Sequence, residues 1–246
     1  LTERYILTER YILTERYILT ERYIHTERDR QTDTMNRVTI AKRFTSTAVK
    51  TTHAPLSAAQ AAYLERVIRV DQAGELGADL IYAGQYLALS HNKKVKPVIK
   101  HMWEQEVVHR TTFNELQVQH RVRPSILTPI WKVGAFGLGF ATGFMNKEAA
   151  MACTEAVETV IGSHYNQQLR VLSNNFGDIK ELDTGKYTDS KEVTNLKNTI
   201  MKFRDEELEH LDTAIKNDSH NARPYWLLTE TIKGIVKGAV FTAERI

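Results

Sequence analysis

The chain has 246 residues, enough for one large domain or two small ones, and its net charge at pH 7 is only +3. So small a positive excess does not indicate a nucleic-acid-binding protein, and we expect no nucleic-acid partner. The single cysteine, Cys153, excludes a disulfide within the chain and any cluster of cysteine metal ligands. Because its neighbours are small and apolar, we expect Cys153 to be a buried thiol without a chemical role.

The first 55 residues differ from the rest of the chain. Residues 1–24 repeat Leu-Thr-Glu-Arg-Tyr-Ile, and a six-residue period matches neither a heptad nor a solenoid unit. We expect residues 1–34 to have no structural role. They would be either an expanded short repeat or a stretch wrongly included at the start of the sequence. Residues 35–55 are basic, rich in hydroxyl groups and free of acidic residues, which is typical of a mitochondrial transit peptide and linker. An ordinary disordered tail is the alternative.

Residues 56–246 are predicted to form one all-α domain. Ser57, with Gln60 three residues later, has the pattern of a helix-capping box. Prolines lie where further helices would begin, and residues 174–189 have the glycines and polar residues of a loop. The expected helices span about residues 57–89, 97–122, 146–173, 190–217 and 224–245.

Two Glu-x-x-His motifs carry the chemistry of this domain: Glu106 with His109, and Glu207 with His210. Residues three apart share one face of a helix, so each pair points the same way. Each pair also lies in an apolar stripe that a helix would turn towards a core: Met102, Glu106, His109, Phe113 and Phe203, Glu207, His210, Ala214. A carboxylate and an imidazole are costly to bury unless something binds them, and a metal ion does so.

Two further glutamates, Glu75 and Glu158, lie on the inward stripes of two other helices. A lone Glu on each of two helices, with Glu-x-x-His on each of two more, is the ligand set of carboxylate-bridged di-iron bundles. Carboxylates and imidazoles suit iron and leave positions open for dioxygen. Glu155 is a rival ligand one turn before Glu158. Gly74 and Gly77 are expected to let another helix pack closely beside Glu75.

Two aspartates have positions from which they could support the ligands. Asp71 and Asp212 lie near ligands on the same helices and could hydrogen-bond a ligand imidazole. Surface charges are the alternative for both.

The segment 125–145 connects the second and third predicted helices and carries one charged residue, Lys132. Its length would suffice to cross a bilayer, but one proline and four glycines argue against a simple span. Three of its phenylalanines, Phe136, Phe140 and Phe144, fall on one helical stripe after Val133. We expect a crossover that also dips into one leaflet of a membrane. A buried crossover helix in a soluble bundle is the alternative.

Several longer motifs resemble those of a known family. They include Arg66-Val-Ile-Arg-Val-Asp-Gln-Ala-Gly-Glu, Ile81-Tyr-Ala-Gly-Gln and Phe203-Arg-Asp-Glu-Glu-Leu-Glu-His. From about Leu56 to Ile246 the chain resembles the mitochondrial 5-demethoxyubiquinone hydroxylases, those of fungi especially. The resemblance implies a ferritin-like four-helix bundle with additional membrane-interacting crossover and C-terminal helices. It also implies hydroxylation of a polyprenyl benzoquinol ring in ubiquinone biosynthesis, with two iron ions, O₂, and NADH as electron donor.

The family's functional residues transfer to this chain by position. The resemblance implies iron ligands at Glu75, Glu106, His109, Glu158, Glu207 and His210. Glu106 and Glu207 would each serve both metals and are the expected catalytic residues. His164 and Tyr165 match a pair beside the substrate ring. The sequence has no Gly-x-Gly-x-x-Gly dinucleotide motif after a strand, so Arg66 and Lys237 are candidates for NADH contact on an unusual surface.

The resemblance also implies a location and partners. We expect a peripheral protein on the matrix side of the mitochondrial inner membrane, with a lipid-binding partner protein and other members of the ubiquinone-synthesis complex. Two other functions use the same residues. One is iron oxidation and storage by a ferritin-like protein, which has no organic substrate. The other is a non-catalytic quinone- or lipid-carrying subunit whose carboxylates pair with arginines.

Overall fold

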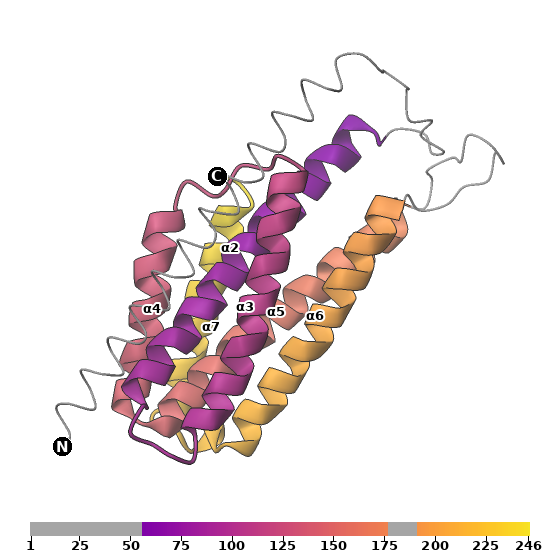
Figure 1. Ribbon diagram of the computed structural model, residues 1–246. Coiled ribbons are helices and arrows are strands. Elements are labelled where there is room, and N and C mark those ends of the chain that lie inside the picture. Colours follow the sequence, from indigo (N-terminus) through magenta and orange to yellow (C-terminus); the bar gives the residue numbers. More distant parts are fainter. Residues whose placement is uncertain (1–55, 177–190) are drawn as a thin grey trace, which may run out of the picture. The chain divides into compact units, whose positions relative to one another are not determined.

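A computed structural model of the chain describes residues 56–176 and 191–246, and these form helices with no strand among them. The predictions for residues 1–34 and 35–55 and for most of the loop at residues 174–189 lie outside the described residues. The helices run side by side (Figure 1). They are α2 (Ala58–Ala88), α3 (Lys96–Gln119), α4 (Thr128–Met145), α5 (Lys147–Asn175), α6 (Lys191–Lys216), the short 3₁₀ helix η2 (Ser219–Asn221) and α7 (Tyr225–Ala243).

The helices begin at residues that the sequence marks as helix caps or as prolines of a first turn. The Ser57 hydroxyl accepts a hydrogen bond from the Gln60 backbone N–H at 3.2 Å, and the Gln60 side chain accepts one from the Ser57 N–H at 2.9 Å. Asn146 caps α5 by accepting from the Ala149 N–H at 2.7 Å. Pro97 and Pro129 lie in the first turns of α3 and α4, where a missing N–H costs no helical hydrogen bond. The predicted helix positions are therefore confirmed within a few residues.

Four helices, α2, α3, α5 and α6, form a bundle whose core is divided into two apolar clusters. Each bundle helix contributes to both clusters. The candidate ligands lie between the two clusters along every helix, so polar groups form a layer inside an otherwise apolar core. The flanking residues of the two clusters are Val67 and Tyr82 on α2, Phe113 and Met102 on α3, Tyr165 and Met151 on α5, and Phe203 and Ala214 on α6.

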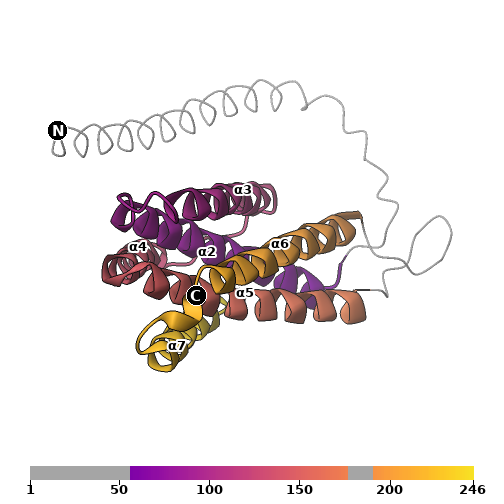
Figure 2. The ribbon, with the colours of Figure 1, turned by 90° about the horizontal axis from the view of Figure 1, so that it is seen from below.

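The crossover is the helix α4, which packs mainly against α2, while α7 packs against α5 (Figure 2). Glycines let α2 and α4 approach closely. A Cβ atom at Gly139 would lie 1.9 Å from the Ile81 carbonyl oxygen, and one at Gly84 would lie 2.4 Å from the Phe136 carbonyl oxygen. Only Gly can occupy such positions without moving a helix backbone.

The outer face of α4 is exposed, so the alternative of a fully buried crossover helix is wrong. Val133 and Phe144 are 78% and 76% exposed, and Phe136 and Phe140 are 37% and 38% exposed. In the part of the chain that the structure describes, no helix has the length and hydropathy needed to cross a membrane. Insertion of this face into one leaflet stays a prediction.

Candidate metal centre

The polar layer brings all six predicted ligands together. Two groups of buried side chains are arranged so that one possible ligand atom from each member lies within 4.8 Å of the others. The groups are Glu75, Glu106, His109, Glu207 and Glu106, Glu158, Glu207, His210. Because Glu106 and Glu207 belong to both groups, the layer has the composition of two adjacent metal positions with two shared carboxylates.

Glu207 and Glu106 each lie between the two imidazoles. The Oε1 and Oε2 atoms of Glu207 lie 3.1 Å from the Nδ1 atoms of His109 and His210, respectively. Glu106 Oε1 lies 3.1 Å from His210 Nδ1, and its Oε2 lies 3.8 Å from His109 Nδ1. Both imidazoles therefore turn Nδ1 inward, towards carboxylates that reach both positions.

Crowding of buried carboxylates shifts the pKa values of the metal-free layer in opposite directions at different residues. Burial, followed by the neighbouring carboxylates, raises the pKa of Glu106 and of Glu158 well above the ordinary range. Burial acts in the same direction on Glu207, but hydrogen bonds from His109 and His210 outweigh it and lower its pKa to about 2. For His109, burial favours the neutral ring, but the hydrogen bond to Glu207 and the negative charge of Glu75 raise its pKa to about 12. Cations placed in this layer would relieve the repulsion among its carboxylates.

Two tyrosines hold the lone glutamates. The Tyr82 hydroxyl of α2 donates to Glu158 Oε1 on α5 at 2.8 Å. The Tyr165 hydroxyl of α5 donates to Glu75 Oε1 on α2. Each tyrosine follows its own helix's lone Glu by seven residues, so the two helices brace each other's carboxylate. Sequence reasoning missed this role for Tyr82, although the Glu-x₆-Tyr spacing occurs on both helices.

The far nitrogens of the two imidazoles are braced in the same crossed manner. His109 Nε2 on α3 lies 2.8 Å from Glu206 Oε2 on α6, and His210 Nε2 on α6 lies 2.9 Å from Gln105 Oε1 on α3. Partners of this kind fix the orientation of a ligand imidazole. The prediction of Asp71 and Asp212 for this role is wrong. Sequence reasoning missed Gln105 and Glu206, although each directly precedes a ligand Glu.

The side chains of Asp71 and Asp212 do not reach a ligand imidazole, because of where each lies on its helix. Asp212 is exposed on α6, as its surface-charge alternative had it. Asp71 is buried on α2, four residues before Glu75, and accepts a hydrogen bond from Gln168 Nε2 at 2.7 Å. Its carboxylate is therefore directed towards α5 rather than towards a ligand imidazole.

The donor set fits metal ions. Four buried carboxylate oxygens in the layer accept no hydrogen bond within the described structure: Glu75 Oε2, both oxygens of Glu106, and Glu158 Oε2. Buried polar atoms normally have partners, and a bound cation would satisfy these. Carboxylate oxygens and imidazole nitrogens are the donors that iron and similar divalent metals accept.

The remaining residues that the sequence analysis singled out lie outside the metal layer. Glu155 is not part of the layer, because the hydroxyls of Ser219 and Tyr225 both donate to its carboxylate and tie η2 and α7 to α5. Cys153 is buried as expected, and burial raises the pKa of its thiol to about 12. Arg66 and Lys237 are both exposed, on α2 and α7, and stay untested as NADH contacts.

A cavity of about 450 Å³ lies against the outer side of α2 and is almost entirely apolar. Residues of α2, α4, α5 and α7 line it. Gly74 and Gly77 are among them, and a Cβ atom at Gly77 would meet nothing within 4 Å. The expectation that these glycines admit a closely packed helix is therefore wrong. Gly77 borders open space, and a Cβ atom at Gly74 would make only an ordinary contact with Ile161 Cδ1, at 3.8 Å.

A much smaller pocket, of about 10 Å³, lies beside this cavity, on the side of the metal layer. Val70, Gly74, Ile161 and Val240 line both spaces. The small pocket is also lined by Asp71, Glu75, His164 and Tyr165. The predicted substrate-proximal pair, His164 and Tyr165, thus lies where the apolar cavity ends and the carboxylates begin.

Comparisons with known proteins identify relatives of this chain. A family model described as "Ubiquinone biosynthesis protein COQ7" matches residues 62–243. The chain is 60% identical over 202 residues to the mitochondrial 5-demethoxyubiquinone hydroxylase of Saccharomyces cerevisiae, covering 80% of this chain and 86% of the relative. It is 44% identical over 204 residues to the human mitochondrial NADPH-dependent 3-demethoxyubiquinone 3-hydroxylase, covering 83% and 88%. It is 40% identical over 186 residues to the 3-demethoxyubiquinol 3-hydroxylase of Rhodospirillum rubrum, covering 76% and 80%.

Proposed function

The chain belongs to the COQ7 family of ubiquinone biosynthesis proteins, and we propose that it hydroxylates the ring of a demethoxyubiquinone that carries a polyprenyl tail. The observation that carries the proposal is the apolar cavity, which shares four lining residues with the small pocket at Glu75. A polyprenyl tail is a long hydrocarbon, and about 450 Å³ of apolar space suits such a group. The polar ring would then lie at the end of the cavity that adjoins the small pocket, towards Glu75, His164 and Tyr165.

We propose iron as the metal, held by the six residues of the polar layer. Glu75 and His109 would bind one ion, Glu158 and His210 the other, and Glu106 and Glu207 both. When bound, the irons supply the redox chemistry that activates dioxygen for hydroxylation. The chain's own contribution is to fix the ligands through crossed hydrogen bonds and to hold the tail in the apolar cavity, with the ring beside Glu75, His164 and Tyr165.

We propose NADH as the electron donor, with Arg66 and Lys237 as contacts. Several relatives are named as NADPH-dependent, so the two nucleotides need direct comparison. Rates measured with NADH and with NADPH at equal concentrations would decide between them. A rate with NADPH at least equal to that with NADH would reject the preference that we propose.

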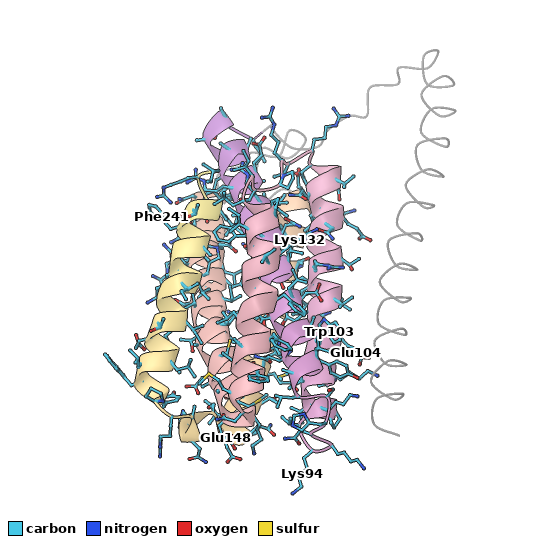
Figure 3. The ribbon with its side chains drawn as sticks, turned by 90° about the vertical axis from the view of Figure 1, so that its left-hand side faces the viewer. Lys94, Trp103, Glu104, Lys132, Glu148 and Phe241 are labelled. Atoms are coloured by element: carbon cyan, nitrogen blue, oxygen red, sulfur yellow. The ribbon has the colours of Figure 1, made fainter. Side chains whose placement is uncertain are left out.

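We also propose that the protein binds the matrix side of the mitochondrial inner membrane through α4 and α7, and that a lipid-binding partner protein and other ubiquinone-synthesis proteins assist it there. Relatives from yeast and human are mitochondrial. Figure 3 looks onto this side, with α4 marked by Lys132 and α7 by Phe241. Large apolar residues are exposed on both helices, which favours contact with lipid: Ile130, Val133, Phe144, Trp226, Leu227, Ile235 and Phe241.

Liposome flotation tests the membrane surface. Replacing Val133 and Phe144 of α4 by Ser should weaken binding to vesicles with a cardiolipin-containing, inner-membrane-like composition. The matched control replaces two exposed valines of α3, Val108 and Val118, which should leave binding unchanged. Equal losses in both double variants would reject α4 as the membrane-facing side.

The two rival functions fit the structure less well. Iron storage has no use for the large apolar cavity. A carrier whose carboxylates pair with arginines disagrees with the layer, where the ion-pair partners of Glu106 and Glu207 are imidazoles. The nearby Arg110 pairs instead with Asp79.

Metal analysis combined with product identification tests the function. The purified protein should contain two irons per chain and convert a demethoxyquinone to its ring-hydroxylated product in the presence of O₂ and a reduced nicotinamide. Iron without any organic product would favour storage, and a bound quinone without iron would favour the carrier.

A further inference from the structure

The two metal positions are built from matching parts. One has Glu75 and His109, the other has Glu158 and His210, and both use the same two shared carboxylates. A tyrosine of the facing helix donates to each lone glutamate, and each imidazole turns Nδ1 towards a shared carboxylate. These features alone would give the two positions similar affinities for a cation. They are named here the His109 position and the His210 position.

The partners of the outer imidazole nitrogens differ between the two positions. His109 Nε2 lies 2.8 Å from a carboxylate oxygen of Glu206, whereas His210 Nε2 lies 2.9 Å from the amide oxygen of Gln105. Each partner directly precedes a shared glutamate in the sequence, so the two occupy equivalent places and differ in charge. An imidazole that binds a cation through Nδ1 carries its proton on Nε2 and donates it to this partner. Gln105 shows that a neutral acceptor is sufficient for that hydrogen bond.

The negative charge of Glu206 is only partly offset by its surroundings. Its Oε2 atom faces the fully buried ring of His109, and its Oε1 atom lies 3.6 Å from Lys202 Nζ. The Lys202 side chain is 63% exposed, so water screens its attraction to Glu206. A carboxylate behind a ligand imidazole makes the ring nitrogen a stronger donor to a metal ion. The His109 position has such a carboxylate, and the His210 position has an amide in its place.

We propose that the two positions fill in a fixed order: the first divalent cation binds at the His109 position and the second, more weakly, at the His210 position. Glu206 is the positioning residue that sets this order, because it supports His109 with a charge that Gln105 does not give to His210. The inference rests on the proposed function and deepens it, because it distinguishes the two ions of the metal layer.

The order has a consequence for the substrate side of the site. Glu75, which belongs to the His109 position, lines the small pocket beside the apolar cavity, and Glu158 does not. The more tightly held ion is therefore the one on the side of the space proposed for the ring. A protein that has lost one ion would keep the ion on that side and lose the ion at Glu158 and His210.

Titration of the metal-free protein with Zn²⁺ tests the order, because zinc accepts carboxylate and imidazole ligands and is diamagnetic. The ring nitrogens of His109 and His210 are followed by NMR in protein labelled with ¹⁵N at histidine. Two-step binding alone would prove nothing, since cations that share carboxylates repel each other at any pair of positions. The test is which ring responds first. With one zinc per chain, His109 should be occupied in preference to His210 by roughly tenfold or more, as expected from the partner of a ligand imidazole.

Exchanging the two partners should exchange the order. Glu206→Gln keeps an acceptor for the imidazole and removes the charge, so both rings should respond together. The double variant Glu206→Gln with Gln105→Glu should load the His210 position first. Asp205→Asn is the matched control, because it removes a charge from the neighbouring residue, which is exposed and pairs with Arg204. It should keep the parent order.

Simultaneous loading or a first response of His210 in the parent would overturn the inference, and so would an unchanged order in the double variant or an equal change in the control. If Glu206→Gln does not fold, Gln105→Glu alone decides, because it should bring His210 level with His109. A parent protein that loads zinc in this order but contains no iron and hydroxylates nothing would reject the proposed function and leave the order standing.

Discussion

The metal layer and the apolar cavity lie on neighbouring faces of the same helix, and they are built in opposite ways. Glu75 faces the layer, where a tyrosine from α5 holds its carboxylate. Gly74 and Gly77 face the cavity, where little or nothing replaces the missing side chains. The layer is built from side chains of helices that are far apart in the sequence. The cavity exists because Gly74 and Gly77 have no side chains to fill it. Substitutions should therefore affect metal binding on one face and tail binding on the other.

The largest effect should follow the loss of a shared carboxylate. Glu207→Ala should abolish activity and reduce iron content far below two per chain, because Glu207 contacts both imidazoles. Helical content should stay near the parent value, since two apolar clusters flank the layer. Iron analysis and circular dichroism measure these outcomes, and two irons retained in the variant would contradict the assignment.

A milder change in the same layer should separate stability from function. Burial and neighbouring carboxylates raise the pKa of Glu106 above its value in the unfolded chain, so raising the pH above the unfolded-chain pKa favours unfolding of the metal-free protein. Glu106→Gln should therefore raise the melting temperature of the metal-free protein while weakening iron binding. The gain should vanish at a pH below the unfolded-chain pKa of about 4.3, where the carboxyl is protonated in both states. A lower melting temperature at pH 7 would contradict this expectation.

The braces of the imidazoles should have an intermediate effect. Removing such a partner typically costs about 10- to 100-fold in metal affinity. Glu206→Ala should weaken binding of one iron in that range, because Glu206 supports only His109. Gln105→Ala should act on the other position, through His210. Competition with a chelator measures both affinities, and loss of both irons together in each variant would contradict independent support.

The sequence carried enough information to predict the layer but not its surroundings. Glu106 and His109 stand out because charged residues are rare on an apolar helical stripe, and the same holds for Glu207 and His210. Their partners could not be predicted in this way. Gln105 and Glu206 are ordinary polar residues until the helices are packed side by side, because each acts on an imidazole of another helix.

The cavity was hidden from the sequence for a different reason. Glycine in a helix has two structural uses, and the residue itself does not distinguish them. Gly139 admits the backbone of α2, whereas Gly77 borders open space. Which use applies depends on where α4 and α7 pack against the bundle. The sequence pattern of α4 did not predict either position. The helix bounds, by contrast, follow from caps and prolines close in sequence and were predicted within a few residues.

The two uses of glycine predict opposite stability effects on α4. Gly139→Ala should cost about 1–3 kcal/mol of unfolding free energy, because its Cβ would overlap the backbone at Ile81. Gly137→Ala, two residues earlier, should stabilise the protein by up to about 1 kcal/mol, since its Cβ meets nothing within 4 Å and Ala is the better helix former. Denaturant titration measures both. Equal destabilisation in the two variants would remove the close approach of α2 and α4 as the cause.

The smallest and most selective effect should come from filling the cavity at Gly77. A Leu there has room, so Gly77→Leu should fold at least as stably as the parent and bind two irons. Its side chain would displace roughly two methylene groups of the tail, each worth about 0.8 kcal/mol when buried. That corresponds to about a tenfold rise in KM for a long-tailed quinone, while a quinone with only a methyl in place of the tail should be unaffected. Gly137→Leu is the control, because Gly137 does not line the cavity. If Gly77→Leu slows both quinones equally, the space beside α2 holds something other than the tail.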